Sequence, residues 1–397
     1  MLVRKIVVIS PSSFPGTSGD TSNYLELLRG IKCKKADVML ICPFHPQGRK
    51  FDKKMKKEGI MTVRVPFNPP RLKELEPGKT VPLALKLAIF CVVELLATLF
   101  VLLKNNARFV VIRHSILTFH LAPLLAMLRI RSIADGETPI NLSVCGSNVP
   151  RVIVRFLKVF EQKLLGFYTF YLASTSSQLP LLNRVGFPRS RTILRNIGID
   201  TSKVPVHNLA EIPKGTFGFF GSLEEWQDPE ILIRSWAKLP DKNPNLRARL
   251  FIIGNGSKKI FLQELARDLG VADKISFCDG VPREILWNKY FKLFRVAIIS
   301  RSSTVYSENA SIKLVEALAA GKPIIATSVP GILAMVKDED GIILVDPDDI
   351  NSMSNAVLKL TNDDSPLFEL SKRALRASRR FKIDVQSDGL LRVLGLS

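Results

Sequence analysis

Two glutamates and a lysine near residue 310 have the residue types and the spacing to act on a polar ligand. Glu308 lies just before a helical pattern, and Lys313 and Glu316 lie on it three residues apart. Ser311 and Gly321 are typical of an N-cap and of the first position beyond a C-cap, so we expect a helix of about ten residues between them. Its polar face would offer one anion and one cation to a ligand. By itself, the pattern also fits an ordinary surface helix with an i, i+3 ion pair.

The elements around this helix alternate along nearly the whole chain. Short β-branched runs are followed by longer helical patterns, which indicates an α/β fold with parallel sheets covered by helices on both faces. Before residue 200 the predicted strands are Lys5–Ser10, Asp37–Cys42, Met61–Val65, Phe109–Arg113, Ser132–Ala134, Tyr168–Ala173 and Thr192–Leu194. After a linker over residues 203–214, they are Thr216–Phe220, Ala248–Ile253, Lys274–Cys278, Arg295–Ser300, Pro323–Thr327 and Gly341–Val345.

Two sheets of similar size on either side of one linker predict two domains, over residues 1–200 and 201–380, followed by a last segment over residues 381–397. In open sheets of this kind, ligands bind beyond the carboxyl ends of the strands. We therefore expect the two domains to face one another across one cleft.

Charge is distributed unevenly along the 397 residues, whose formal net charge is +21. Residues 1–200 contain 30 Lys and Arg against 12 Asp and Glu, a net of +18, whereas residues 201–397 contain 27 against 24, a net of +3. The first half would attract nucleic acid, an anionic membrane leaflet or phosphorylated substrates. A solvated basic surface without a partner is the alternative. The composition, 46% hydrophobic and 23% charged, excludes a mainly disordered chain.

One apolar segment is long enough to reach across a bilayer. Residues 83–103 carry only two charges, Lys86 and Glu94. A carboxylate near the centre of a spanning helix costs about 2.5–3.5 kcal/mol, which disfavours spanning. A buried domain helix, a helix lying in the membrane interface and a spanning helix all stay open as interpretations.

Two basic segments favour an anionic surface. Residues 151–165 place Arg151, Arg155 and Lys158 on one helical stripe, and residues 49–57 form a basic loop. Packing of the apolar side inward, with solvated charges outside, is the alternative. These segments lack the interleaved aromatic residues that stack on bases, so lipid phosphates are favoured over nucleic acid.

Glycine and cysteine patterns argue against several other classes. Gly16 and Gly19 follow the first strand and could bring backbone amides to a phosphate, but neither they nor Gly254 and Gly256 complete G-x-G-x-x-G, which disfavours a nicotinamide dehydrogenase. The five cysteines are scattered, so we expect neither a disulfide framework nor a metal site. The opening MLVRKIVVIS lacks the pattern of a signal peptide, which predicts a cytoplasmic protein.

Together, these segments resemble retaining glycosyltransferases of family 4. The E-x7-E element of that family corresponds to Glu308 and Glu316, and its A-x-x-A-G-x-P run follows as residues 317–323. Further matching segments are Gly198-Ile199-Asp200, Gly221-Ser222-Leu223, Ile253-Gly254-Asn255-Gly256 and Phe277-Cys278-Asp279-Gly280-Val281. Gly16 and Gly19 fit the glycine loop of the family's N-domain less closely. The likeness covers roughly the whole chain; it is strong over residues 216–347 and weak before them.

The resemblance implies the GT-B fold, with two Rossmann-like domains, a nucleotide-sugar donor in the C-domain and the acceptor mainly in the N-domain. A last helix, here Phe381–Leu396, would return to the first domain. Glu316 would hold the ribose hydroxyls, and Glu308 would lie by the sugar hydroxyls. The other donor-binding candidates are Asn309, Ala310 and Ser311 near the diphosphate, with Gly221, Ser222, Gly254, Gly256, Arg283 and Gly19.

The sequence departs from the family at the residues that contact the diphosphate. Where members carry Arg and Lys, this chain has Ser222 and Gln227. We expect Lys313 to take their place, with Arg283 and Arg301 behind it.

A second departure concerns the N-domain histidine, which is missing from the aligned segment. Asp135 lies there instead, and His114 is a second candidate for the role. The predicted catalytic residues are therefore Glu308, Lys313 and Asp135.

The residues and the resemblance together predict a retaining hexosyltransferase at the cytoplasmic face of the membrane. Its donor would be a UDP- or GDP-hexose, used without a metal or other cofactor, and its acceptor a lipid-linked or surface glycan. An anionic membrane surface is an expected partner, and nucleic acid is not. The alternatives are another GT-B enzyme, such as an inverting transferase or a sugar-nucleotide epimerase, or a basic nucleic-acid-binding protein.

Overall fold

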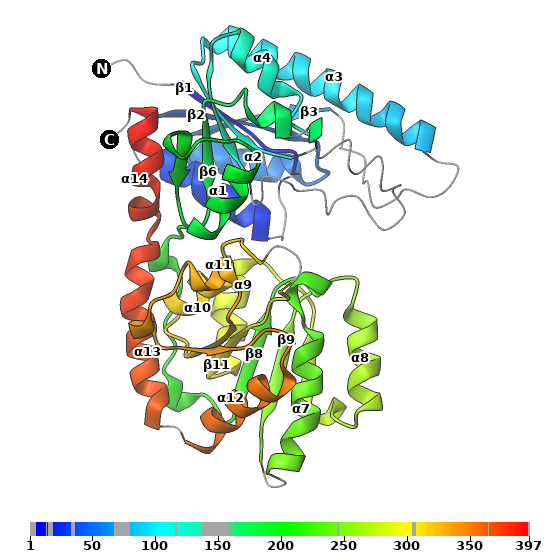
Figure 1. The fold of residues 1–397 in the computed structure, drawn as a ribbon, viewed down its shortest axis with the longest axis vertical. Helices are drawn as coiled ribbons and strands as arrows, with labels where there is room; N and C mark the ends of the chain where they lie inside the picture. Colours follow the sequence, from blue (N-terminus) through cyan, green and yellow to red (C-terminus); the bar gives the residue numbers. More distant parts are fainter. Residues whose placement is uncertain are drawn as a thin grey trace. The chain divides into compact units, whose positions relative to one another are not determined.

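The structure is a computed structural model that describes residues 5–12, 14, 19–32, 36–66, 80–115, 117–136, 159–160, 162–243, 246–303, 307–363 and 365–395. The chain divides into two compact units. Unit 1 is mainly Tyr24–Arg195 together with Ser387–Ser397, and unit 2 is mainly Asn196–Gln386. Each unit contains one parallel sheet, and Figure 1 shows the elements of both.

The sheet of unit 1 has the strand order β3-β2-β1-β4-β5-β6-β7, with every neighbouring pair parallel. Its strands are β1 (Lys5–Ile9), β2 (Asp37–Pro43), β3 (Ile60–Val65), β4 (Phe109–Arg113), β5 (Arg131–Asp135), β6 (Phe170–Ala173) and β7 (Thr192–Leu194). These confirm the strands predicted for the first half of the chain. Most could be predicted because they are short buried apolar runs, whereas β3 and β7, at the two edges of the sheet, are only partly buried.

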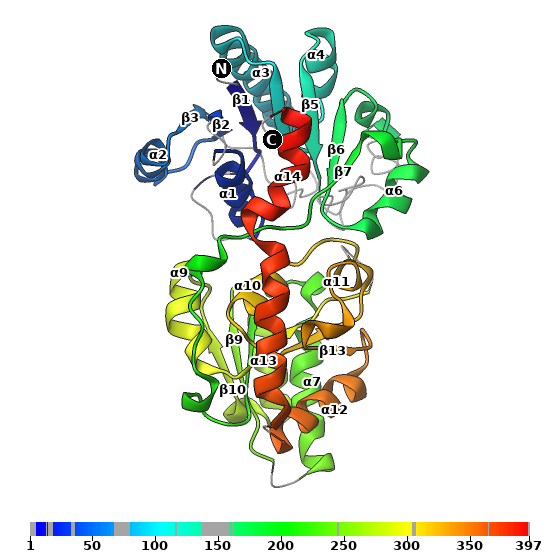
Figure 2. The same cartoon turned by 90° about the vertical axis from the view of Figure 1, so that its left-hand side faces the viewer.

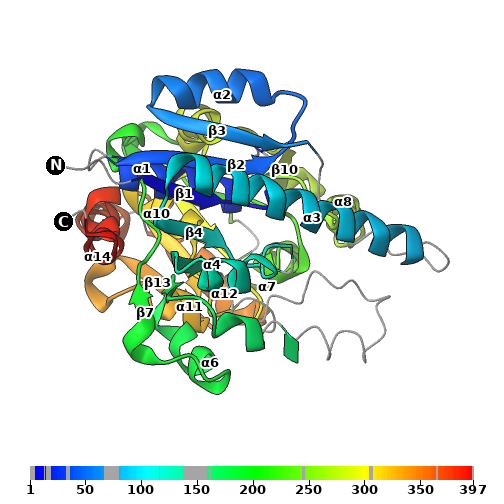
Figure 3. The same ribbon diagram turned by 90° about the horizontal axis from the view of Figure 1, so that it is seen from above.

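Alternate residues of these strands build two cores. On one face, Val7 and Ile9 pack with α3 (Thr80–Asn105) and α4 (Leu121–Met127). On the other face, Ile6 and Val8 pack with α1 (Gly19–Lys32), α2 (Gly48–Lys57) and α14 (Ile383–Leu394), as Figure 3 helps to follow. This is the two-residue period of a strand that is buried on both sides.

The two ends of unit 1 differ in how well the sequence predicted them. The last helix was expected over Phe381–Leu396, and α14 lies there, with Leu390 and Leu394 in the core of unit 1. The sequence places Gly19 in a glycine loop after the first strand, but α1 begins at Gly19. Gly19 is therefore helical, because the helix extends back over the polar residues that were assigned to the loop.

The sheet of unit 2 has the order β10-β9-β8-β11-β12-β13, again with parallel pairs throughout. Its strands are β8 (Thr216–Phe220), β9 (Arg249–Ile253), β10 (Ile275–Cys278), β11 (Val296–Ile299), β12 (Ile324–Thr327) and β13 (Ile342–Val345). These confirm the strands predicted after the linker. Both sheets thus have the doubly wound order of Rossmann folds, with a switch point beside the first strand of each unit, where such folds bind ligands.

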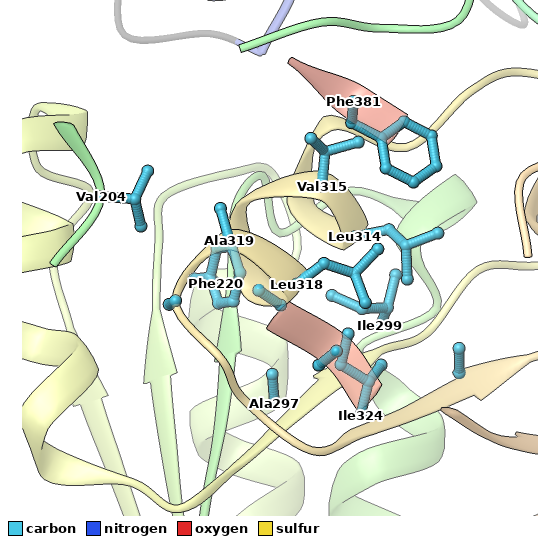
Figure 4. Close-up of a cluster of buried hydrophobic side chains, with 14 of the residues drawn as sticks. Val204, Phe220, Ala297, Ile299, Leu314, Val315, Leu318, Ala319, Ile324 and Phe381 are labelled. Atoms are coloured by element: carbon cyan, nitrogen blue, oxygen red, sulfur yellow. The ribbon is translucent and has the colours of Figure 1, made fainter. Parts of the chain in front are cut away.

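Helices cover both faces of the unit 2 sheet. On one face, α7 (Glu230–Lys242), α8 (Lys259–Asp268) and α12 (Ile350–Asn362) pack on Phe217 and Phe219 of β8. On the other face, α10 (Ile312–Ala319) packs with α13 (Ser365–Ser378), which Figure 2 shows in front of it. Figure 4 shows Leu314 and Leu318 of α10 in the same buried cluster as Ile299 and Ile324. This packing fixes the position of α10 at the carboxyl edge of the sheet.

Candidate functional site

Helix α10 has the ends that the sequence predicts. The Ser311 hydroxyl oxygen caps it by accepting from the Leu314 N–H at 3.4 Å. Gly321 follows the C-cap with φ of +64°, a left-handed conformation that glycine adopts without strain, and its carbonyl accepts from Ser371 of α13 at 2.6 Å. Because α10 follows β11, which pairs with β8, its N-terminus lies at the switch point of the unit 2 sheet.

The polar face of α10 is more enclosed than the sequence predicts. Lys313 is 7% exposed and Glu316 is 4% exposed, and Ala317 and Ala320 are also buried. The reason is that two other segments cover this face: the end of β8 with the turn after it, and the turn that follows β10. Each charged residue has a partner on one of these segments.

Lys313 is held by the first segment. Its ammonium donates to the Gln227 side-chain oxygen and lies 4.4 Å from the centre of the Phe219 ring. Burial, assisted by the nearby Arg301 guanidinium, lowers the pKa of Lys313 well below its ordinary value, and Glu316 opposes this only in part. The site therefore contains a buried cation whose charged form an anionic ligand would stabilise.

Gln227 is the residue that sequence reasoning identified as a departure but did not recognise as a partner. It lies in η7 (Glu225–Gln227), and its carbonyl accepts from Ser300 at the end of β11 at 2.7 Å. Its side chain takes the place of a second cation beside Lys313. The sequence gives no signal for this contact beyond the neutral side chain of Gln227, which does not repel a lysine from α10.

Glu316 is held by the second segment. Its carboxylate accepts from the Arg283 guanidinium at 2.5 Å, and the Arg283 guanidinium carbon lies 4.8 Å from the centre of the Trp287 ring. Arg283 begins the short helix α9 (Arg283–Ile285). An ionised carboxylate has about four acceptor positions, so an arginine contact is compatible with two ribose hydroxyls on the same group.

The loops after β8 and β9 approach each other at the same edge. Gly221 has φ of +127°, and a Cβ there would lie 2.9 Å from Lys313 Cδ. A Cβ at Gly254 would collide with the Gly221 carbonyl, and one at Gly256 with the Leu223 carbonyl. Only glycine permits this contact. Ser222, between these loops, is exposed.

The loop before α10 carries the remaining donor-binding candidates. Glu308 is half-buried, whereas Asn309 and Ala310 are buried. The Asn309 carbonyl accepts from the Arg301 guanidinium. The Ser311 N–H, which the resemblance assigns to the diphosphate, donates to Met335 Sδ at 3.1 Å. The loop is thus fixed from both sides.

Asp135 belongs to unit 1 and lies apart from this group in the chain. It ends β5, is buried, and lies 3.6 Å from the Arg113 guanidinium. Its carbonyl accepts from the His114 N–H at 2.8 Å. The structure therefore brings Glu308, Lys313 and the donor-binding candidates of unit 2 to one sheet edge, and places Asp135 and His114 at the carboxyl edge of the other sheet.

Some predicted site residues lie outside the described residues. They are Gly16 and the basic stripe of Arg151, Arg155 and Lys158. Within the described ranges, no group of His, Cys, Asp and Glu has the arrangement of a metal site.

Part of the chain, including this edge of the unit 2 sheet, matches a known protein family. Residues 207–381 match the family model described as "Glycosyl transferases group 1". This match covers β8 to α13, and therefore every candidate site residue from Gly221 to Glu316. The prediction of a transferase is supported. Family 4 and retention stay predictions.

Relatives of the chain are similar over part of their length. A D-inositol 3-phosphate glycosyltransferase of Rhodococcus jostii (strain RHA1) is 26% identical over 286 residues, which are 68% of this chain and 59% of the relative. One of Stackebrandtia nassauensis is 30% identical over 185 residues, 45% of this chain and 41% of the relative. The chain thus spans less than two thirds of the length of these relatives.

Solved structures match over nearly the whole chain. Anabaena HepE, solved in complex with UDP and glucose, has a TM-score of 0.73 at 14% identity, covering 99% of both chains. Sucrose-phosphate synthase from Thermosynechococcus elongatus has a TM-score of 0.76 at 16% identity, also covering 99% of both chains. With the two doubly wound sheets, these matches show the GT-B fold, which confirms the predicted fold class.

Proposed function

We propose that the protein is a retaining glycosyltransferase of family 4 that moves a hexose from a nucleoside-diphosphate sugar to a lipid-linked or surface-glycan acceptor. The observation that carries the proposal is the arrangement around α10. A capped helix at a switch point carries a buried lysine and a buried glutamate, within the residues that match the group 1 model. UDP or GDP is the proposed nucleotide, and the solved complex of HepE with UDP-glucose supports UDP as the first choice to test.

In this proposal, different residues bind the ribose, the diphosphate and the hexose of the donor. Glu316, oriented by Arg283, accepts the two ribose hydroxyls. Lys313 and the N-terminus of α10 face the diphosphate, with Arg301 behind the loop. Glu308 orients the hexose. Lys313 releases Gln227 or shares its contact when the diphosphate binds.

Retention follows if the acceptor attacks on the face from which the diphosphate leaves. The bond from the anomeric carbon to the phosphate oxygen breaks, the bond to the acceptor oxygen forms, and the acceptor proton passes to the leaving phosphate oxygen. The protein mainly stabilises the departing negative charge, which buried cations do well in a low-dielectric site. We infer that no metal or other cofactor takes part, because Lys313 and the helix N-terminus supply the positive charge. Asp135 of unit 1 is the proposed catalytic residue near the acceptor.

The acceptor and the location are proposed from charge. The net of +18 over residues 1–200 favours an acceptor with a lipid-linked phosphate at the cytoplasmic face of a membrane.

The test is a transfer assay with UDP- and GDP-hexoses, using detergent-solubilised membrane lipids as the acceptor pool. We expect release of nucleoside diphosphate with one donor and a product whose anomeric configuration, measured by NMR, equals that of the donor. An inverted product would contradict retention. Absence of nucleotide release with every donor and acceptor would contradict the transferase proposal. Glu264→Ala on α8, which removes an exposed carboxylate far from α10 in the sequence, is the matched control and should retain full activity.

A further inference from the structure

Helix α3 presents a continuous apolar stripe outward. Its large exposed side chains recur every three or four residues, so they share one side of the helix. They are Leu85 (61% exposed), Ile89 (44%), Val92 (57%), Leu96 (57%), Phe100 (62%) and Leu103 (68%). The stripe covers Leu85 to Leu103, about 27 Å at 1.5 Å per residue. An apolar stripe this long on a folded domain indicates a partner.

The opposite side of α3 is fixed to unit 1. Phe90, Val101 and Leu102 are buried in the core between α3 and the sheet. Glu94 and Thr98 are buried on the same side, and the Glu94 carboxylate lies 3.7 Å from the ring of His120, the residue just before α4. The polar residues that interrupt the apolar sequence therefore point into the protein. Figures 1 and 3 show α3 as one long helix on the surface of unit 1.

This packing decides between the interpretations of α3 that the sequence left open. Ala88–Asn105 has a mean hydropathy of 2.0 and is long and apolar enough to cross a membrane. Only 28% of this segment is buried inside the protein, which is too little for the helix of a closed core. Crossing would expose Glu94 and Thr98 to hydrocarbon and remove one wall of the unit 1 core. A fully buried domain helix is excluded by the exposed stripe. A helix that lies in the plane of the membrane interface keeps Glu94 and Thr98 inside the protein and places the apolar stripe against lipid.

Charge around the stripe identifies the surface that it fits. Between residues 80 and 134 the exposed charged side chains are all basic: Lys86, Lys104, Arg108, Arg129 and Arg131. The single acidic residue there is the buried Glu94. Met127 at the end of α4 adds an apolar side chain that is 81% exposed. Basic residues beside an apolar stripe match acyl chains beneath anionic headgroups. Pairing with a second copy would instead bring like charges together.

We propose that α3 attaches the protein to an anionic bilayer by lying in the plane of the interface, with Leu96 and Phe100 among the acyl chains. The inference names the membrane partner of the proposed function. Membrane binding is measured without any transfer reaction, so a protein that does not bind membranes could still be a transferase, and a protein without transferase activity could still bind membranes.

The first experiment is cosedimentation of the full chain with vesicles of phosphatidylcholine, with or without phosphatidylglycerol. We expect binding that requires the anionic lipid and weakens with salt. The double variant Leu96→Asp, Phe100→Asp should lower the partition coefficient by about tenfold or more. The control variant Ile260→Asp, Phe261→Asp, on the exposed side of α8 in unit 2, should bind as the wild type does.

Three outcomes would overturn the proposal. In cosedimentation, the wild type could fail to bind anionic vesicles, or the α3 variant could bind them equally well. In sedimentation velocity, the wild type could form a dimer that the α3 variant dissociates, since the stripe would then be a self-interface. Far-UV circular dichroism of the variant checks that it is folded.

A second experiment separates in-plane attachment from spanning and uses milder variants. Ile89→Trp, Leu96→Trp and Leu103→Trp are each added to vesicles with brominated acyl chains. An in-plane helix predicts quenching from a similar, shallow depth at all three positions. A spanning helix would instead give a markedly deeper position at Leu96 than at Ile89 and Leu103. That result, or quenching no greater than that of wild type and of Ile260→Trp, would contradict the proposal.

Discussion

Lys313 is the residue whose surroundings say most about the proposed donor. It is enclosed by an amide oxygen, an aromatic ring and a glycine, none of which carries a full negative charge, and the nearby Glu316 carboxylate offsets burial only in part. Burial therefore lowers its pKa. A diphosphate would supply the missing counter-charge and raise the pKa again. Binding and protonation are thus linked at this residue.

This linkage gives a prediction at the residue scale. UDP-glucose binding should take up a proton at pH values between the pKa values of Lys313 in the free and the bound protein. Affinity should be highest below that range and should fall as the pH rises through it. Titration calorimetry in two buffers of different ionisation enthalpy measures the proton uptake, and UDP-glucose avoids the terminal phosphate that titrates in UDP.

Lys313→Met tests the assignment because it keeps much of the volume and removes the charge. The variant should bind about tenfold or more weakly, as expected for loss of a charge-assisted contact, and should show no proton uptake. Proton uptake of wild-type size in this variant would assign the titrating group elsewhere.

At the scale of elements, α3 and α4 are joined by a buried carboxylate, Glu94, and a half-buried imidazole, His120. Burial raises the pKa of Glu94 to about 8 and lowers the pKa of His120 to about 4. At a separation of 3.7 Å the two could form an ion pair, but burial favours the neutral form of each. Near neutral pH the contact is therefore one between a carboxylic acid and a neutral imidazole.

The protonation of Glu94 predicts how stability depends on pH. In the unfolded chain Glu94 loses its proton near its ordinary pKa of 4.5, whereas in the folded protein it keeps the proton up to about pH 8. The contribution of Glu94 to the free energy of unfolding should therefore fall by up to about 1.4 kcal/mol per pH unit between about pH 5 and pH 8. The lowered pKa of His120 gives an opposite slope up to its ordinary pKa of 6.5, so the net fall from this pair is expected mainly between about pH 6.5 and pH 8. Glu94→Gln should flatten this slope in urea unfolding followed by circular dichroism. Glu264→Gln on α8 is the control, and an unchanged slope in Glu94→Gln would contradict the assignment.

Local signals explain which elements could be predicted from the sequence. The strands and the two ends of α10 depend on apolar runs, a serine cap and a glycine, all of which lie within a few residues of one another. The contacts within the site join residues that are far apart in the sequence. Gln227 and Lys313 are separated by 86 positions, and Arg283 and Glu316 by 33. Tertiary packing likewise separates the two charges that the sequence shows in residues 83–103, because it buries Glu94 and leaves Lys86 exposed.

At the scale of the whole molecule, the two units have separate cores and separate proposed tasks. Unit 2 contains the nucleotide candidates, and unit 1 contains α3 and most of the positive charge. All three tryptophans, Trp226, Trp236 and Trp287, belong to unit 2. Tryptophan fluorescence therefore reports the unfolding of the proposed donor unit alone.

The most direct test of the central claim is thermal unfolding followed by tryptophan fluorescence, with increasing UDP, GDP or the matching UDP- and GDP-hexoses. At one hundred times its Kd a ligand adds about 2.7 kcal/mol to the free energy of unfolding. We predict that one nucleotide raises the transition temperature of the wild type and of the control Glu264→Ala. Glu316→Ala should abolish this rise, whereas Glu308→Ala should keep most of it and mainly slow transfer. No rise with any nucleotide, or a full rise in Glu316→Ala, would contradict a nucleotide-sugar site at α10.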